Sequence, residues 1–524
     1  MPSHVLFAGL GATPDQQGRI RSLCATRGLF PLFIDRWDDW RISIFPTSGA
    51  VEISSSDGTQ RATHATIKGI LLFDDPTVPP ADAADVVFQR AEYEAMLAGL
   101  CACLAPRLLR RWQARAAGWS DASSPANENA ACHSLQRLLR KTGPCEAVIL
   151  DGAIVVQRVD GPIEVLELEA VGYPPPSTLS WQRGTTNIRE RAGRVARWII
   201  DSDQALNLAL SSACADHQSA FPAVALGVGQ RRVSDRGGIT ILAYETDTVA
   251  QHLARAAASR ALDARFVALN DYDDMPESSD EAQPWLDDLS SAQVVFARVI
   301  AAGDSTTSCP EGAPHQAAVR RALARRQAPT INMPGAGFSN SYKAAHIREL
   351  TLLGLKVPET IVTNDPRALG RFLADHQRLV YKSCSSMRSL VHDFRTIDLP
   401  RIALLPRCPC LFQVRVEGPG CRAHVVADCV SSVAIEGATI DYRAPGSGAR
   451  LTPIVLPEPL NESLILASQR LGLLLAGWDL IHTRGSESWA VLECNVMPAF
   501  DYYDSRSGTS TASLILDFMS GATA

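Results

Sequence analysis

Three oxygen-bearing side chains near the carboxyl end of the chain could together hold a divalent cation. Asp479 stands in the apolar run GWDLI, and Glu493 and Asn495 stand in the later run VLECNV. Both runs have the composition of β-strands and are predicted to form a hairpin. Glu493 and Asn495 are two residues apart, so their side chains should project from one face of the strand. Carboxylate and amide oxygens are the ligands that Mg²⁺ prefers, so the sequence predicts a magnesium site at this hairpin.

Positively charged side chains stand before this hairpin, at the ends of other expected elements. Lys343 opens a segment with helical spacing of apolar residues, and Lys382 ends the short strand LVYK. Arg422 follows a Gly-Pro-Gly turn and leads into another predicted strand. A lysine is a compact point charge, and an arginine is a planar fork that matches phosphate oxygens. These cations, together with a bound magnesium ion, could neutralise the concentrated negative charge of a triphosphate.

The elements that must position these residues alternate between strand and helix. Two parts of the chain show the same succession of a strand, a helix, a strand and a later strand followed by a helix, which suggests an internal repeat. Strands that alternate with helices in this way predict two small open α/β sheets. The strands expected in the two copies are His4–Gly9, Phe30–Asp35 and the run from Ile67 in the first, and Ile239–Tyr244, Arg265–Asn270 and the run from Ala292 in the second.

A middle region, which begins with strand-like segments near Glu146, is open to two interpretations. Its run LELEAVGYPP is similar to the run LECNVMPAF at the carboxyl-terminal hairpin, so Glu167 would correspond to Glu493 and Glu169 to Asn495. In the first interpretation, the amino-terminal half is a shrunken copy of the carboxyl-terminal half, which could bind a substrate or hold a homodimer together. In the second, it is an unrelated α/β domain.

Composition excludes several classes of protein. The chain has 524 residues, 46% of them hydrophobic and 20% charged, which is typical of a globular protein with several domains. Its formal net charge of −6 gives no reason to expect a nucleic acid partner. No uninterrupted apolar run is long enough to predict a membrane span, and no secretory signal is recognised. The 13 cysteines are scattered, as expected in the reducing cytoplasm.

The region from about Thr330 onward resembles an ATP-grasp ligase. Within that superfamily it is most similar to the synthetases of graspetides, which are microviridin-type peptides, and to the glutamate ligase that modifies a ribosomal protein. The resemblance implies that Arg422 is directed at phosphates, that Arg443 is a catalytic residue in an Asp-aromatic-Arg signature, and that Asp479, Glu493 and Asn495 hold one or two Mg²⁺ ions. It also implies a nucleotide site at Lys343, Lys382 and the adenine-reading hinge Gln413, Val414, Arg415 and Val416. One departure is that the loop 383–389 has no glycine, whereas many ATP-grasp enzymes use glycine amides there. Ser385, Ser386 and Arg388 could donate to the nucleotide in place of those amides.

The expected fold class is therefore α/β, with an α+β ATP-grasp fold at the carboxyl end. Residues 1–115 should form a pre-ATP-grasp-like domain, and residues 131–230 a middle region that could be a degenerate ATP-grasp remnant. Residues 234–330 should form the pre-ATP-grasp domain, and residues 331–524 the catalytic domain.

The expected function is an ADP-forming carboxylate–amine ligase of specialised metabolism. It would activate the carboxylate of a small peptide or amino acid as an acylphosphate and join it to an amine or hydroxyl. The alternatives are an ATP-binding protein without ligase activity and an ATP-grasp phosphotransferase or carboxylase, since a fold does not fix a function.

Overall fold

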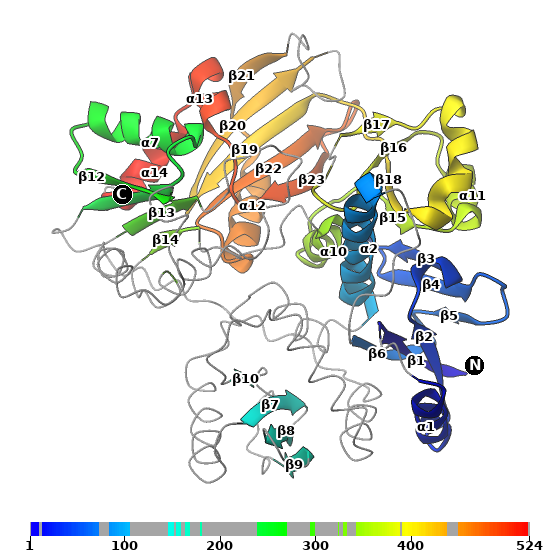
Figure 1. Cartoon of the computed structure of the whole chain (residues 1–524). Helices are drawn as coiled ribbons and strands as arrows, with labels where there is room; N and C mark the ends of the chain where they lie inside the picture. Colours follow the sequence, from blue (N-terminus) through cyan, green and yellow to red (C-terminus); the bar gives the residue numbers. More distant parts are fainter. Residues whose placement is uncertain are drawn as a thin grey trace. The chain divides into compact units, whose positions relative to one another are not determined.

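The computed structural model describes residues 2–9, 13–72, 83–104, 145–150, 153–158, 163–167, 179–180, 238–269, 294–298, 323, 329–332, 342–387, 390–437 and 449–521. The chain divides into two compact units (Figure 1). Unit 1 comprises residues 1–224, 361–375 and 396–411, and unit 2 comprises residues 225–360, 376–395 and 412–524. Helices occur with both parallel and antiparallel sheets, which confirms the predicted α/β class. No helix in the described ranges is long and apolar enough to cross a lipid bilayer.

Unit 1 begins with the small parallel sheet that the sequence predicts. Its strand order is β2-β1-β6, so the first strand of the chain lies in the centre. Helix α1 begins at a capping box, in which the Thr13 side chain accepts from the Gln16 amide and the Gln16 side chain accepts from the Thr13 amide. The bounds are β1 Ser3–Ala8, α1 Pro14–Ala25, β2 Leu29–Ile34, β6 Ile67–Leu72 and α2 Ala83–Leu104.

Between β2 and β6, the chain forms three antiparallel strands that the sequence analysis did not predict. Strand β3 is paired on one side with β4 and on the other with β15, a strand more than 300 residues later in the chain. The neighbouring order within unit 1 is therefore β15-β3-β4-β5. The bounds are η1 Trp37–Asp39, β3 Trp40–Phe45, β4 Ala50–Ser55, β5 Arg61–Thr63, β15 Thr360–Thr363, α11 Pro366–Asp375 and η5 Thr396–Arg407.

The middle region contains an antiparallel sheet of order β10-β7-β8-β9, which agrees with the strands predicted there. Glu167 is the last residue of β9 and is paired with Ala153. Glu169 lies outside the described residues. The bounds are β7 Cys145–Leu150, β8 Ala153–Arg158, β9 Ile163–Glu167 and β10 Leu179–Ser180.

Unit 2 begins with a second parallel sheet, of order β12-β11-β13-β14. Its first strand lies between the second and the third, as in the β2-β1-β6 sheet, so the two copies expected from the sequence share one strand order. Helix α7 is capped by Asp247, whose side chain accepts from the Ala250 amide at 2.8 Å. The bounds are β11 Ile239–Ala243, α7 Thr248–Ser259, β12 Ala264–Ala268, β13 Val294–Arg298 and β14 Thr330–Ile331.

The larger sheet of unit 2 is antiparallel, of order β21-β20-β19-β22-β23. Alternate residues of β19 and β22, such as Ala423 and Trp478, are buried in a core that includes residues of helix α12. The residues between them face the opposite side of the sheet, because the side-chain period of a strand is two. The remaining bounds are α10 Lys343–Leu352, β16 Leu379–Lys382, β17 His392–Asp393, β18 Cys410–Val414, β19 Gly420–Val426, β20 Cys429–Glu436, β21 Arg450–Ile454, α12 Glu458–Arg470, β22 Leu475–His482, β23 Trp489–Asn495, α13 Asp501–Ser507 and α14 Thr511–Met519.

Candidate active site

Three charged residues form a row across the antiparallel sheet of unit 2. Arg422 on β19 is paired with Asp479 on β22, and Asp479 is paired with Glu493 on β23. Directly paired residues in antiparallel strands project from the same face, so the three side chains stand side by side. The register shifts after Asp479, and Leu480 is paired with Val491 rather than with Leu492. This irregularity keeps Leu480 and Val491 in the core while Glu493 stays beside Asp479.

Arg422 is held from several sides. Its Nη1 donates to Oδ1 of Asp479 at 2.7 Å, and its guanidinium lies 5.6 Å from the centre of the Tyr503 ring. Gly477 is the next residue of β22 on this face, and its missing side chain leaves room for the guanidinium. Arg422 is only 4% exposed, so its ion pair with Asp479 is formed largely away from water.

Asn495 completes the expected metal-binding set. It is paired with Gly477, one step along the same face from Glu493. Its Nδ2 donates to Oδ2 of Asp479 at 3.1 Å. Both carboxylate oxygens of Asp479 therefore have partners, and the Asn495 amide is fixed with its nitrogen toward Asp479. The structure brings together all three side chains that the sequence predicts as metal ligands.

Both predicted lysines are buried in unit 2. Lys343 begins α10 and is 4% exposed, and Lys382 ends β16 and is 8% exposed. The Lys343 ammonium donates to the backbone oxygen of Ser385, and its amide donates to the oxygen of Cys384 at 3.1 Å. Helix α10 is thereby joined to the loop that follows Lys382. A lysine side chain is rarely this buried unless its charge has a partner.

The two lysines lower the pKa of Glu493. Burial by itself raises the pKa of a carboxyl group, but Lys382 and Lys343 outweigh it and lower the pKa of Glu493 to about 2. The pKa of Asp479 is raised, by burial first and then by the neighbouring Glu493, although Arg422 opposes this. Asp479 and Glu493 are paired across β22 and β23, and the positive charges that act on them are Arg422 on the first and Lys382 and Lys343 on the second.

The residues expected to read adenine lie at and after the end of β18. Gln413 is buried and its Nε2 donates to Thr360 Oγ1 at 3.0 Å, so its side chain is a structural support. The Val414 amide donates to the Glu359 oxygen at 2.8 Å, and the Arg415 amide to the Arg378 oxygen at 3.0 Å. The Arg415 side chain forms an ion pair with Asp393 at 2.5 Å. Among the described residues, no backbone partner is found for the Val416 amide.

The loop after Lys382 is only partly described. Ser385 is buried, and its Oγ accepts from the Met387 amide at 3.1 Å, which makes a tight polar turn without glycine. Its backbone oxygen also accepts from Ser383 Oγ at 2.9 Å. Ser386 is exposed. Arg388 lies outside the described residues, and so does Arg443.

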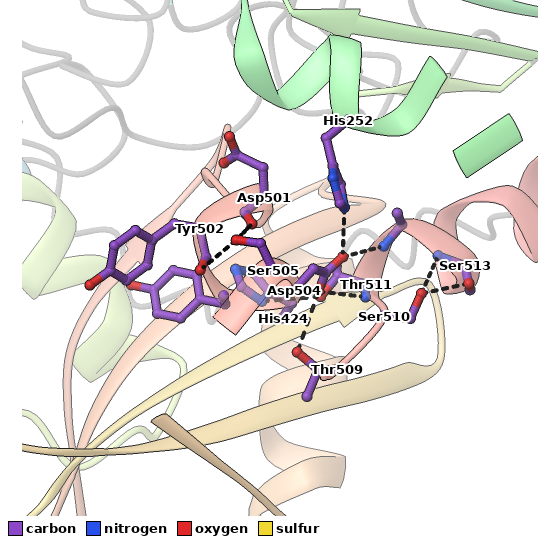
Figure 2. A network of polar contacts seen from close by, with 12 residues as sticks. His252, His424, Asp501, Tyr502, Asp504, Ser505, Thr509, Ser510, Thr511 and Ser513 are labelled. Atoms are coloured by element: carbon purple, nitrogen blue, oxygen red, sulfur yellow. Dashed lines mark hydrogen bonds and ion pairs between the residues drawn. The ribbon is translucent and has the colours of Figure 1, made fainter. Parts of the chain in front are cut away.

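His424, which the sequence analysis does not assign to the site, holds the Arg422 guanidinium by a hydrogen bond. Its Nε2 accepts from Nε of Arg422 at 3.3 Å, so Nδ1 carries the proton and can donate to Thr511 Oγ1 at 3.4 Å. Burial lowers the pKa of His424 well below its ordinary value, and Arg422 lowers it further. Figure 2 shows that Thr511 in turn lies beside Asp504, which accepts the Thr511 amide at 2.9 Å. Asp504 also forms an ion pair with His252 of α7 at 3.4 Å.

The leading parallel sheet of unit 2 anchors the ends of the two metal-site strands. Asn332 follows β14, and its Nδ2 donates to the backbone oxygens of Leu475 and Val496, each at 2.5 Å. Its Oδ1 accepts the Leu475 amide at 2.9 Å. Arg298 of β13 donates to the backbone oxygens of Met497 and Pro498 at 3.2 and 3.3 Å. These links fix where β22 begins and where β23 ends.

Comparison with protein-family models finds no match, and comparison with curated proteins finds none either. Among solved structures, the ATP-grasp ligase PsnB complexed with a minimal precursor is 21% identical, covers 55% of this chain and 100% of its own, and has a TM-score of 0.46. The macrocyclase MdnC bound with precursor peptide MdnA from Microcystis aeruginosa MRC is 16% identical over 54% and 99% of the two chains, with a TM-score of 0.44.

A third similar structure is an ATP-grasp ligase from Chryseobacterium gregarium, associated with ribosomally made peptides, in complex with ADP and a leader and core peptide. It is 15% identical over 55% of this chain and 98% of its own, with a TM-score of 0.44.

Proposed function

We propose that this chain is an ATP-dependent ligase that activates a carboxylate as an acylphosphate and joins it to an amine or hydroxyl. The observation that carries the proposal is the convergence of buried charges in unit 2. Lys343 and Lys382 both act electrostatically on Glu493, and Arg422 is bonded to Asp479 next to it. Buried charges that are costly to maintain are typical of sites that bind and polarise charged ligands.

The donor set fits magnesium. Asp479 and Glu493 are two carboxylates paired across neighbouring strands, and a divalent cation would relieve their mutual repulsion. Asn495 adds a neutral amide beside them. When bound, Mg²⁺ and ATP supply the cation and the phosphoryl group that turn a carboxylate into a good acyl donor. The part of the protein would be to hold these groups and to keep Arg422 and both lysines directed at the negative charge that must be neutralised.

The hinge would read the base of the nucleotide. The amides of Val414 and Arg415 are bonded within the protein, so the Val416 amide is the one that would face the base. We assign Ser385 and Ser386 to the phosphate side of the same site. Ser385 is held by its own turn and by Lys343, so its position is fixed before any ligand binds.

The remaining assignments extend the same proposal. Residues 234–330 would be the pre-ATP-grasp domain, and residues 331–524 the catalytic domain. Residues 1–115 would be a second copy of the pre-ATP-grasp domain. Residues 131–230 would be a remnant of a catalytic domain that binds no ATP. The substrate would be a small peptide or an amino acid, and the place of action the cytoplasm. Eight of the cysteines in the described part of the chain are free thiols.

The test is ADP release by the full-length protein with Mg²⁺ and ATP. Release that requires both a carboxylate and an amine, tried first with short acidic peptides and amino acids, supports a ligase. Release with a hydroxyl or phosphate acceptor alone supports a phosphotransferase, and binding of ATP without release under any condition supports a protein that only binds nucleotide. The Asp479→Asn variant, measured in parallel, shows whether any release comes from this site.

A further inference from the structure

His346 is a buried histidine that neither the metal set nor the nucleotide set includes. It lies on α10, three residues after Lys343, and it is 3% exposed. Its Nε2 accepts from the backbone amide of Cys494 at 3.0 Å. Cys494 stands between Glu493 and Asn495, so this hydrogen bond reaches the strand at the point where two of the proposed metal ligands are attached.

The position of β23 in its sheet explains why this bond matters. β23 is an edge strand, with β22 on one side only. Alternate amides of an edge strand point away from the sheet and have no partner in the ladder. Two such amides are bonded by the segment that contains α10, since Cys494 donates to His346 and Val491 donates to the Lys356 oxygen at 2.8 Å. A buried amide without a partner would otherwise be costly.

The chemistry of the ring fixes its protonation state. A backbone amide only donates, so Nε2 of His346 must be unprotonated and Nδ1 must carry the hydrogen. No partner of Nδ1 is found among the described residues, so nothing there opposes this tautomer. The charged groups that act on the ring are Glu493 and Lys382. A neutral imidazole beside these two charges is suited to accepting a hydrogen bond from a backbone amide rather than to carrying a charge.

We propose that His346 is a positioning residue that holds Glu493 and Asn495 in place for the metal by bonding the amide between them. The proposal rests on the proposed function, because it assigns His346 a role toward the magnesium site. Lys343 is on the same helix, so α10 would set the distance between a phosphate-binding lysine and the metal-binding strand. Residues that orient metal ligands in this way typically change metal affinity about 10- to 100-fold when they are lost.

The experiment compares the full chain with His346→Leu, which removes the acceptor, and His346→Gln, which retains one. The matched control is His4→Leu, since His4 is also a buried histidine, 6% exposed, but lies on β1 of unit 1. Amide hydrogen exchange of the peptide that covers residues 489–497 is measured without metal. Binding of Mn²⁺ in the presence of ADP is measured separately by electron paramagnetic resonance.

We expect faster exchange in this peptide and roughly tenfold weaker Mn²⁺ binding in His346→Leu, with both properties near the wild type in His346→Gln and His4→Leu. Unchanged exchange and unchanged Mn²⁺ affinity in His346→Leu would overturn the role of His346. Failure of the wild type to bind Mn²⁺ with ADP would instead overturn the proposed function. If His346→Leu does not fold, His346→Met replaces it, because a thioether is a weak acceptor on a side chain of similar reach.

Discussion

The guanidinium of Arg422 occupies the space that a side chain at Gly477 would fill. A Cβ atom at Gly477 would stand 2.2 Å from Nη2 of Arg422 and 2.5 Å from Cβ of Pro498. Neither contact is tolerable between non-bonded heavy atoms, so both Arg422 and Pro498 would have to shift. Gly477 lies in the middle of β22, with β19 and β23 on its two sides, and it is held by both ladders. Of its two neighbours, Arg422 has the flexible side chain and should be displaced further.

Gly477→Ala should therefore displace Arg422 from Asp479 while the sheet remains folded. We expect turnover to fall by about 10²–10³, as when a key electrostatic contact of an active site is removed, and stability to fall by roughly 1–3 kcal/mol from overpacking. The measurements are ADP release and the thermal unfolding midpoint. Gly370→Ala is the control, since a Cβ there meets nothing within 4 Å. Wild-type turnover in Gly477→Ala would mean that the position of Arg422 does not matter for the reaction.

Removing a single negative charge from the carboxylate pair should abolish turnover. Asp479→Asn leaves Arg422 without its ion-pair partner, and Glu493→Gln leaves two buried lysines without their main counter-charge. Each change also weakens the magnesium site, so we expect at least about 10²–10³ lower ADP release with the fold retained. Glu487→Gln, an exposed carboxyl in the turn of the same hairpin, is the control. Near-normal activity in both site variants would show that the hairpin is not catalytic.

Lys382 should contribute to nucleotide binding directly. The Lys382→Ala variant loses a buried cation, and a charged contact of this kind is worth about 1.5–3 kcal/mol, or roughly ten- to a hundredfold in affinity. Calorimetric titration with a non-hydrolysable ATP analogue measures it. Lys356→Ala, which removes an exposed ammonium bonded to Ser488, should leave the dissociation constant unchanged. If Lys382→Ala also binds the analogue normally, Lys382 only neutralises Glu493.

The sequence was sufficient to predict that Asp479, Glu493 and Asn495 come together, because their placement depends on local rules. The two-residue period puts Glu493 and Asn495 on one face, and the polar segment between two apolar runs predicts a hairpin that brings Asp479 to the same place. The positions of Lys343 and Lys382 were predictable for a similar reason, since each stands at the boundary of a helix or strand with a clear pattern of apolar residues. These predictions needed no knowledge of contacts between distant segments.

The features that the sequence analysis missed depend on contacts between distant segments. The absence of a side chain at Gly477 matters only because the guanidinium of Arg422, 55 positions earlier in the chain, occupies the space beside it. His346 and Cys494 are 148 residues apart, and a lone histidine on a helix gives no signal of such a bond. A search for a buried histidine one turn after a site lysine would have been the nearest available clue. The pairing of β3 with β15 joins residues more than 300 positions apart.

That pairing gives a prediction about Asn364, which is fully buried at the end of β15. Its Oδ1 accepts the Ile42 amide at 2.7 Å, and its Nδ2 donates to the Trp40 oxygen at 3.0 Å. Asn364→Ala would leave the Ile42 amide buried and unpaired, whereas the Trp40 oxygen would keep the hydrogen bond that it accepts from Nη1 of Arg41 at 3.1 Å. We therefore expect a loss of roughly 1–3 kcal/mol in stability. The thermal unfolding midpoint of the variant measures this loss and should be lower than that of the wild type.

Asn461→Ala is the control for Asn364→Ala, because Asn461 makes one longer bond, to the Leu456 oxygen at 3.3 Å. Equal midpoints for the two variants would contradict the importance of the β3–β15 pairing. A fragment that begins near residue 234 would lack β3, so its β15 edge should be destabilised in the same way.

The last prediction concerns pH and follows from the neutral state of His346. Burial lowers the pKa of His346 to about 4, from an ordinary value of 6.5. As the pH falls below the ordinary value, the unfolded chain takes up a proton that the folded chain refuses, so the folded state loses stability until the pH reaches the folded pKa. The loss from this group should be about 1 kcal/mol near pH 5.5 and roughly 2–3 kcal/mol near pH 4.5.

The His346→Gln variant isolates this contribution because glutamine accepts the Cys494 amide at every pH and does not titrate. Other groups titrate alike in both proteins, so the difference between their thermal midpoints is the quantity to follow. Between about pH 7.5 and 4.5 the difference should shift steadily in favour of the variant. A difference that stays constant over this range would mean that His346 is charged in the folded protein at acidic pH, and an imidazolium cannot accept the Cys494 amide.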